Sequence, residues 1–278
     1  MRNSYIVYII FVFHFSCTNS ETKLFEKLSS FRTGIDFENN LTFKEDFNIF
    51  TYRNYYNGGG VGLGDINNDG LLDIYFTSNL NKNKLYLNKG DFQFEDITDV
   101  AGVGGEKSWS TGVSLADINA DGFLDIYVSN SGDIKGDNKQ NELFINNGDL
   151  TFTEMANEYG LDDKGYSTHA AFFDFDRDGD LDCYLLNNSY KGGFRITSIG
   201  KDQRPVRDEV GGDKLFENDN GKFIDISEEA GIYGSVIGFG LGVTVGDSNN
   251  DGWMDIYVSN DFFERDYLYI NNQDGTFS

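Results

Sequence analysis

The sequence predicts an all-β protein, a β-propeller built of four-stranded antiparallel blades, from three observations. A nine-residue acidic loop occurs four times at comparable spacing. Extended, β-rich runs lie on both sides of each loop, and a second hairpin with alternating apolar residues follows each copy. Four short antiparallel strands, repeated along a chain, are the unit from which a propeller is made. Sandwiches and barrels also use short strands, but they do not place the same loop in every fourth connection.

The four loops share the pattern D-x-[DN]-x-D-G-x-x-D and start 52, 57 and 73 residues apart. Calcium is a hard cation that takes roughly 6–8 oxygen ligands at about 2.3–2.6 Å. Side chains at positions 1, 3, 5 and 9 and the carbonyl at position 7 supply such oxygens, and the glycine at position 6 makes the bend. The predicted ligands are Asp65, Asn67, Asp69, the carbonyl of Leu71 and Asp73; Asp117, Asn119, Asp121, Phe123 and Asp125; Asp174, Asp176, Asp178, Asp180 and Asp182; and Asp247, Asn249, Asp251, Trp253 and Asp255.

Two alternatives to this calcium site fit the sequence less well. An EF-hand needs a glutamate at position 12 and flanking helices, whereas position 12 is Phe76, Val128, Leu185 or Val258 within β-rich runs. A simple turn needs one Asp or Asn, and three carboxylates within nine residues would repel each other without a cation. We therefore expect about four Ca²⁺ ions, which would change the formal charge from −24 to −16.

Composition excludes other classes of protein. The chain has 22 Lys and Arg against 46 Asp and Glu, too few cations for the basic face that nucleic acid requires. Its 39% hydrophobic and 15% aromatic content exclude a disordered acidic tail. The acidity must therefore come from cation sites together with ordinary solvated surface.

The amino terminus has the features of an export signal. A positive start precedes the apolar run 4–16, which is too short to span a membrane. We expect residues 1–16 to be a signal peptide and Cys17 to be lipidated, because the sequence around this cysteine is similar to a bacterial lipobox. Cys183, the other cysteine, lies in a predicted strand and is expected to be a buried free thiol.

The remaining chain divides into a lead-in and blades. Residues 17–57 form the lead-in, whose stretches 41–43 and 47–52 could supply a closing strand. Blades are expected at about 58–104, 105–162, 163–232 and 233–278. The last blade stops where its outer strand begins, which indicates the amino-terminal part of a longer protein.

The loops and hairpins resemble FG-GAP/VCBS repeats, which also build the propeller of integrin α-chains. The segments TGIDFENN (33–40), 52–79 and 260–277 are similar to bacterial VCBS-repeat proteins that often end in an ASPIC/UnbV domain. The resemblance implies a calcium-stabilised propeller of about seven blades, four of them visible here, in an exported protein without enzymatic activity. The sequence given contains no ASPIC/UnbV segment.

Several other features allow two interpretations. The glycine runs 60–64 and 238–242 precede no helix, so they are expected to let inner strands crowd at a propeller axis rather than bind nucleotide. His169 either lines that axis or is packed in a strand. Trp109 and Trp253 are candidates for a sugar-stacking platform, although Trp253 lies in a calcium loop. The basic insertion 189–213 could contact an anionic partner or be a solvated decoration.

These observations lead to one main functional hypothesis and two alternatives. The main one is a non-enzymatic, calcium-binding repeat lipoprotein of the cell envelope, at the outer membrane or cell surface. It would bind or adhere to a protein or polysaccharide, sit on the membrane through Cys17 and bind no nucleic acid. The first alternative is an extracellular enzyme acting on polysaccharide, with catalytic groups on the propeller face or in a further part of the protein. The second is a structural scaffold in an uptake or assembly complex.

Overall fold

The computed structural model describes residues 24–52, 54–107, 109–132, 139–189, 203–261 and 264–278. The predicted signal peptide and Cys17 lie outside these residues. Within them, 15 strands form four antiparallel sheets, and three short helices accompany the sheets. The predicted all-β fold of propeller blades is therefore confirmed.

Each sheet is formed by consecutive strands of the chain. The first contains β1 (Val61–Gly64), β2 (Asp73–Phe76), β3 (Lys84–Asn88) and β4 (Phe94–Asp96); the second β5 (Ser110–Ala116), β6 (Asp125–Asn130), β7 (Glu142–Asn146) and β8 (Phe152–Glu154); the third β9 (Ser167–Phe173), β10 (Asp182–Asn187), β11 (Lys214–Asn218) and β12 (Phe223–Asp225); the fourth β13 (Gly240–Gly246), β14 (Asp255–Asn260) and β15 (Tyr267–Tyr269). The helices are α1 (Ser30–Thr33), α2 (Thr98–Ala101) and α3 (Ala156–Tyr159). In the fourth sheet, the bridge between Asn271 and Phe277 stands where the other sheets have an outer strand.

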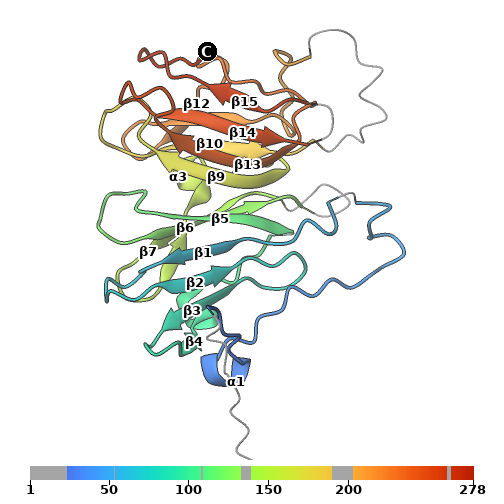
Figure 1. Ribbon diagram of the computed structural model, residues 1–278, viewed down its shortest axis with the longest axis vertical. Coiled ribbons are helices and arrows are strands. Elements are labelled where there is room, and N and C mark those ends of the chain that lie inside the picture. The colour runs from blue at the N-terminus through green and yellow to red at the C-terminus, as the bar shows by residue number, and fades with distance from the viewer. Residues whose placement is uncertain (1–23, 53, 108, 133–138, 190–202, 262–263) are drawn as a thin grey trace, which may run out of the picture.

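Each acidic loop closes the first hairpin of its sheet. The last aspartate of the loop pairs in register with the residue that precedes the first aspartate, as Gly64 pairs with Asp73 and Phe173 with Asp182. The loop is therefore a bulging connection between an inner strand and its neighbour. All four loops consequently lie at the same end of the sheets. The later part of the lead-in, residues 41–57, lies at the other end, whereas α1 lies beneath β4 (Figure 1).

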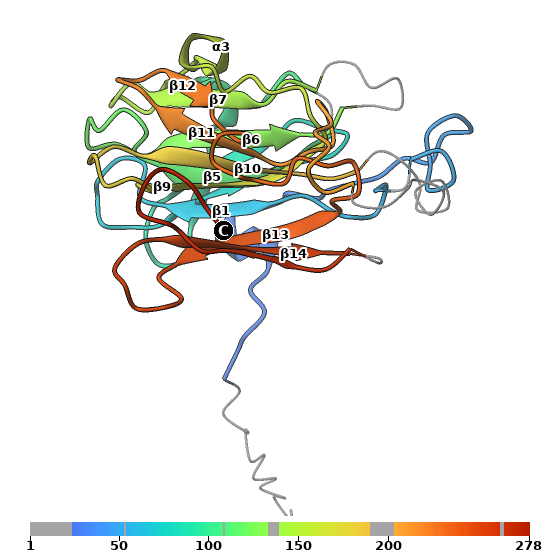
Figure 2. The same ribbon diagram turned by 90° about the horizontal axis from the view of Figure 1, so that it is seen from above.

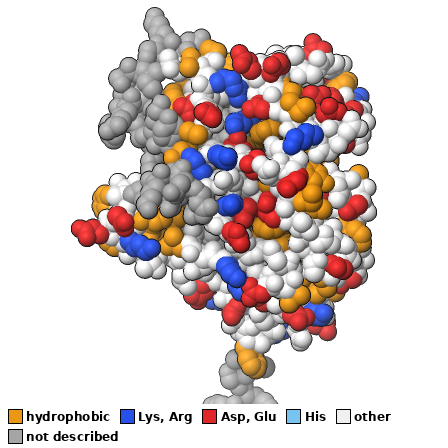
Figure 3. Space-filling model, turned by 180° about the vertical axis from the view of Figure 1, so that it is seen from behind, with side chains coloured by type: hydrophobic (Ala, Val, Ile, Leu, Met, Phe, Trp, Pro, Cys, Tyr) orange, Lys and Arg blue, Asp and Glu red, His pale blue; other side chains and the backbone are white. Residues whose placement is uncertain are grey.

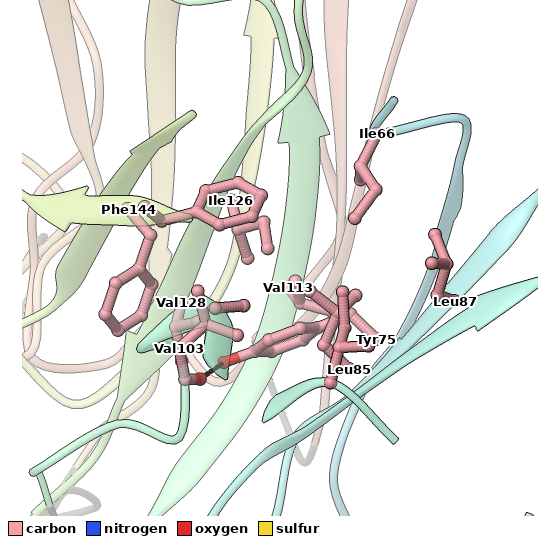
Figure 4. Close-up of a cluster of buried hydrophobic side chains, with 12 residues drawn as sticks. Ile66, Tyr75, Leu85, Leu87, Val103, Val113, Ile126, Val128 and Phe144 are labelled. Carbon is pink, nitrogen blue, oxygen red and sulfur yellow. Dashed lines mark hydrogen bonds between the residues drawn. The ribbon is translucent and has the colours of Figure 1, made fainter. Parts of the chain in front are cut away.

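Hydrophobic clusters between neighbouring sheets hold the blades together. The first two sheets occupy the lower half of Figure 1 and the last two the upper half, and Figure 2 shows them from above. Tyr75, Ile126 and Val128 belong to the cluster between the first and second sheets, where the Tyr75 hydroxyl donates to the Val103 carbonyl at 2.7 Å (Figure 4). Equivalent clusters join the second sheet to the third and the third to the fourth. Each blade is therefore stabilised by its neighbours.

Close approach of the inner strands requires glycine. A Cβ on Gly60 would lie 2.8 Å from the Thr111 carbonyl oxygen, and one on Gly240 would lie 2.3 Å from the side chain of Leu186. These contacts agree with the prediction that the glycines let strands crowd together. Cys183, in β10, is a buried free thiol as expected.

The structure of the lead-in differs from two expectations drawn from the sequence. Its described residues form turns and the short helix α1, and no closing strand occurs among them. Phe47, Tyr52 and Tyr55 instead pack around Trp109, which is only 1% exposed. Trp109 therefore offers no free face for sugar stacking, because the aromatic side chains of the lead-in cover it.

The insertion lies between β10 and β11, and part of it, residues 190–202, lies outside the described chain. Two of its arginines contact this protein itself. Arg204 pairs with Glu264 at 2.8 Å, and Arg207 donates to the carbonyls of Ile232 and Asp213, each at 3.0 Å. Arg204 therefore helps to attach the insertion to the fourth repeat, and Arg207 joins it to the end of the third repeat. On the face shown in Figure 3, acidic groups are scattered among polar and apolar ones and are not gathered in a single patch.

Asp213 is a buried carboxyl at a position where the first two repeats carry asparagine. Its oxygens accept from the Asn187 amide at 2.9 Å and the Tyr184 hydroxyl at 3.0 Å. Asn141 makes the corresponding bonds to the Asn130 amide and to Tyr127 in the second repeat. Burial raises the pKa of Asp213 to about 7, although the nearby Arg207 opposes this shift.

We expect Asp213→Asn to stabilise the protein at pH 8. The folded chain holds the proton of Asp213 up to about pH 7, whereas the unfolded chain releases it near pH 4. The free energy of unfolding of the natural chain therefore falls as the pH rises through that window. A carboxamide at this position does not titrate, so the variant should gain on the order of 1–2 kcal/mol relative to the natural chain between pH 5 and pH 8.

Urea unfolding in EDTA at both pH values measures this difference. The reciprocal change, Asn141→Asp, is the matched control and should introduce a loss of stability over the same pH window. The prediction would be contradicted if the free energy of unfolding of Asp213→Asn fell relative to that of the natural chain as the pH rises.

Candidate metal centre

The third loop places carboxylate oxygens together most closely. One oxygen from each of Asp174, Asp176 and Asp182 lies within 4.8 Å of the others. Asp180 Oδ1 is buried and has no hydrogen-bond partner among the described residues. A set of hard oxygen donors with one unsatisfied member is the kind of site that a calcium ion fits.

Proximity of these carboxyls disfavours their ionisation. Burial raises the pKa of Asp182 to about 7, with neighbouring carboxylates adding to the effect. Burial, followed by the charges of Asp178, Asp176 and Asp174, raises the pKa of Asp180 to about 6. A bound divalent cation would favour the charged forms and remove this repulsion.

The other three loops share one hydrogen-bond pattern. In the first loop, Asp65 accepts from the amides of Asp69 at 3.0 Å and Gly70 at 2.7 Å. Asp69 accepts from the Leu71 amide at 2.9 Å and from the Asn67 side chain at 3.0 Å. The second and fourth loops repeat these bonds at the corresponding positions. Among the described residues, only the third loop brings three carboxylate oxygens within 4.8 Å, since asparagine replaces aspartate at position 3 of the other loops.

The closing aspartates are buried and bonded at both oxygens. Asp255 is 2% exposed and accepts from the Ser248 and Asn271 amides, each at 2.9 Å. Asp73, Asp125 and Asp182 make the same pair of bonds. These aspartates therefore have a structural role in the loop in addition to the metal-binding role that the sequence predicts.

Sequence reasoning missed the asparagines that bond to the closing aspartates. They are Asn88, Asn146 and Asn218, each the last residue of the third strand of its repeat, and Asn271, two residues after β15. The side chain of Asn146 also donates to Ile66 at 2.9 Å, and that of Asn271 donates to Phe175 at 2.8 Å, each in the loop of the preceding repeat. The recurring asparagine at the end of each YLN, FIN, FEN or YIN segment was the available signal.

Neighbouring loops also contact each other directly. Asn68, in the first loop, donates to the Gly122 carbonyl of the second at 2.9 Å. Arg177, in the third loop, donates to the Gly252 carbonyl of the fourth, and its guanidinium carbon lies 4.4 Å from the centre of the Trp253 ring. The Trp253 ring thus makes a cation–π contact with Arg177, which agrees with the interpretation that Trp253 is structural.

Comparison with known proteins agrees with this repeated geometry. The sequence model of the FG-GAP-like repeat matches residues 38–128 and 131–185. The chain belongs to the FG-GAP-like repeat family. The narrower resemblance to VCBS proteins with an ASPIC/UnbV domain stays a prediction.

Three curated relatives of this FG-GAP-like repeat protein are known as Cartilage acidic protein 1. The Xenopus tropicalis protein is 30% identical over 215 residues, which cover 74% of this chain and 29% of the relative. The human and mouse proteins are each 28% identical, and again 74% of this chain is covered, against 28% and 29% of the relatives. The chain therefore spans less than a third of the length of these relatives.

A distant structural likeness exists to a lectin of Agrocybe aegerita described as recognising non-reducing terminal N-acetylglucosamine. The TM-score is 0.40 at 17% identity, covering 78% of this chain and 49% of the lectin. A likeness this distant assigns no ligand to the repeats described here. No helix in the described ranges has both the length and the apolar character needed to cross a lipid bilayer.

Proposed function

We propose that this chain is a calcium-stabilised FG-GAP-like propeller module that binds a protein or polysaccharide at the cell envelope and catalyses no reaction. The observation that carries the proposal is the convergence of Asp174, Asp176 and Asp182 in the third of four homologous loops. In the same proposal, residues 1–16 direct export and a lipid on Cys17 holds the protein at the membrane.

Calcium would act here on stability. Asp174, Asp176, Asp178, Asp180 and Asp182 would supply side-chain or carbonyl oxygens in the third loop, and the corresponding residues would do so in the other loops. The carbonyl of Ile66 in the first loop accepts a hydrogen bond from Asn146 of the next sheet. The carbonyl of Phe175 in the third loop likewise accepts one from Asn271. An ion that orders a loop would therefore also support the contact between blades.

The end of the sheets opposite the loops is suited to ligand binding. The later part of the lead-in (residues 41–57) and the described ends of the connections after β6 and β10 lie there, and each of these connections is longer than a tight turn. Binding residues commonly lie on such connections because the rigid sheets beneath them hold them in place. The family membership supports a binding module, and the long connections indicate the face that would bind.

Thermal unfolding with calcium and then with excess EDTA, at matched ionic strength, tests the calcium part of the proposal. Only the folded state should hold the ions, and each site at one hundred times its Kd adds about 2.7 kcal/mol. With several sites filled, the midpoint should rise by about 10 °C or more. Magnesium at the same concentration is the control and should give a much smaller rise, because it dehydrates reluctantly and prefers strict octahedral sites. No rise in a folded chain, or an equal rise with magnesium, would refute calcium binding.

A further inference from the structure

A pocket of about 450 Å³ with polar and apolar groups in its lining lies at the end of the sheets opposite the acidic loops. Residues from the inner strand regions of all four sheets and from the lead-in line it: Asn54, Asn57, Gly58–Gly60, Trp109, Thr111, Gly112, Ser131, Thr168, His169, Gly240 and Leu241. None of these residues is Asp, Glu, Lys or Arg, although 24% of the chain is charged. As far as the described residues form it, the pocket lining is thus uncharged in a protein of net charge −24.

His169 departs from the internal repeat. It lies five residues before the first aspartate of its loop, and the other three repeats carry glycine there, as Gly60, Gly112 and Gly242. A Cβ on Gly60 would come within 2.8 Å of backbone atoms of the neighbouring sheet, which explains the glycine. The third repeat therefore places an imidazole at a position where packing requires glycine in the first two repeats.

The His169 imidazole is available to a ligand. It lines the pocket and makes no hydrogen bond in the part of the chain that the structure describes. Burial lowers its pKa, so the ring is neutral at pH 7 and offers one donor and one acceptor. The side chains of Asn54 and Asn57, which also line the pocket, make no hydrogen bonds to described residues either.

The rim of the pocket is held in place by the residues beneath it. Tyr55 packs on Trp109, with ring centres 5.4 Å apart. The Asn79 side chain donates to the Gly58 carbonyl at 2.9 Å. The Thr111 hydroxyl of the second sheet donates to the Ser167 carbonyl of the third sheet at 2.7 Å. The free polar groups therefore project from a fixed frame, which lowers the entropic cost of binding.

We propose that this pocket binds a neutral, hydroxyl-rich sugar residue and that His169, Asn54 and Asn57 provide its specificity. This inference rests on the proposed binding function and deepens it. Sugar hydroxyls need both donors and acceptors, which neutral imidazole and carboxamides supply together. Among the described residues that line the pocket, an anionic ligand would find no cation and would meet the negative field of the protein, and a cationic one would find no carboxylate. The volume falls within the range of small-molecule sites, roughly 300–1,000 Å³.

The NMR signals of the His169 imidazole can detect a ligand in the pocket. The sequence has two histidines, and His14 lies in the proposed signal peptide, so His169 is the one histidine of the chain from residue 17 onward. Its imidazole NMR signals are assigned by their loss in the variant His169→Gly. We expect glucose, galactose, mannose, cellobiose or maltose to shift the His169 signals in a saturable way. Glucuronic acid, the charged control, should bind more weakly than the neutral sugars.

Variants then separate binding from folding. His169→Gly restores the residue that the other repeats use, so it should fold, and Asn57→Ala removes an exposed carboxamide from the rim. Each should weaken by at least tenfold the binding of the sugar that shifts His169, measured by calorimetry. Asn147→Ala, an exposed asparagine at the loop end of the second sheet, is the matched control and should bind normally.

Two results would overturn the inference. One is the failure of all five sugars to shift the His169 signals; the other is an affinity that changes less than twofold in His169→Gly. Tighter binding of glucuronic acid would overturn the choice of a neutral ligand. Calcium-dependent melting of the same samples distinguishes these failures from failure of the calcium proposal, since His169 lies at the end of the sheet away from the loops.

Discussion

Asp255→Ala should cost about 3 kcal/mol of unfolding free energy even when no calcium is present. The side chain is 2% exposed, and its two oxygens accept from the amides of Ser248 and Asn271. Alanine would leave both donors buried without a partner, at a cost of roughly 1–3 kcal/mol each. It would also loosen Asn271, whose side chain bonds to Phe175 in the third loop. Urea unfolding in EDTA measures this loss directly.

Asp251→Ala separates the structural role from the proposed metal-binding role. Asp251 lies in the same loop, but it is exposed. In EDTA, its replacement should therefore reduce stability much less than the replacement of Asp255. Calcium should raise the free energy of unfolding of both variants less than that of the natural chain, because the fourth loop of each variant no longer contributes a full site. If Asp255→Ala were no more damaging than Asp251→Ala in EDTA, the closing aspartate would have no structural role of its own.

Local sequence was sufficient to predict the parts of the fold that depend on local chemistry. The D-x-[DN]-x-D-G-x-x-D spacing predicted where each inner hairpin turns, because the glycine and the alternating carboxylates are set by the loop itself. Short runs of Ile, Tyr and Val predicted strands such as β6 and β14 for the same reason. The four sheets and their order along the chain followed from these two signals.

The lead-in could not be predicted this way. Residues 47–52 contain apolar and aromatic side chains that suit an extended strand, but the structure folds them into turns. Their aromatic rings are used to cover Trp109, about sixty residues later in the sequence. Whether such a segment pairs as a strand or packs as a cluster depends on this distant partner, which no local pattern reveals.

The candidate sites show the same limit. The carboxylates of each loop are neighbours in sequence, so their grouping was predictable. The bonds from Asn146 and Asn271 to the preceding repeat span 80 and 96 residues and depend on how the blades pack. The pocket around His169 likewise gathers inner strand regions from four repeats. Alignment of the repeats with each other would have shown His169 as the exception among glycines, without showing what surrounds it.

Gly112→Ala should destabilise the protein by about 3 kcal/mol, although it adds a single methyl group. The new Cβ would lie 2.4 Å from the Thr168 carbonyl oxygen and 2.9 Å from the His169 Cα, both of which are backbone atoms. Backbone atoms of a paired strand cannot turn aside as a flexible side chain does, so the second and third sheets would have to separate. The hydrophobic cluster between them, which includes Tyr127 and Leu185, would then lose contacts.

Gly246→Ala is the matched control for this change. Gly246 also belongs to an inner strand, β13, and a Cβ there would meet nothing within 4 Å. Its replacement should leave the urea midpoint unchanged or raise it slightly, because alanine restricts the unfolded chain. Equal effects of the two substitutions would show that glycine is used in the inner strands for a reason other than the approach of neighbouring sheets. A large loss confined to Gly112→Ala would show that the distance between inner strands limits the stability of the blade interface.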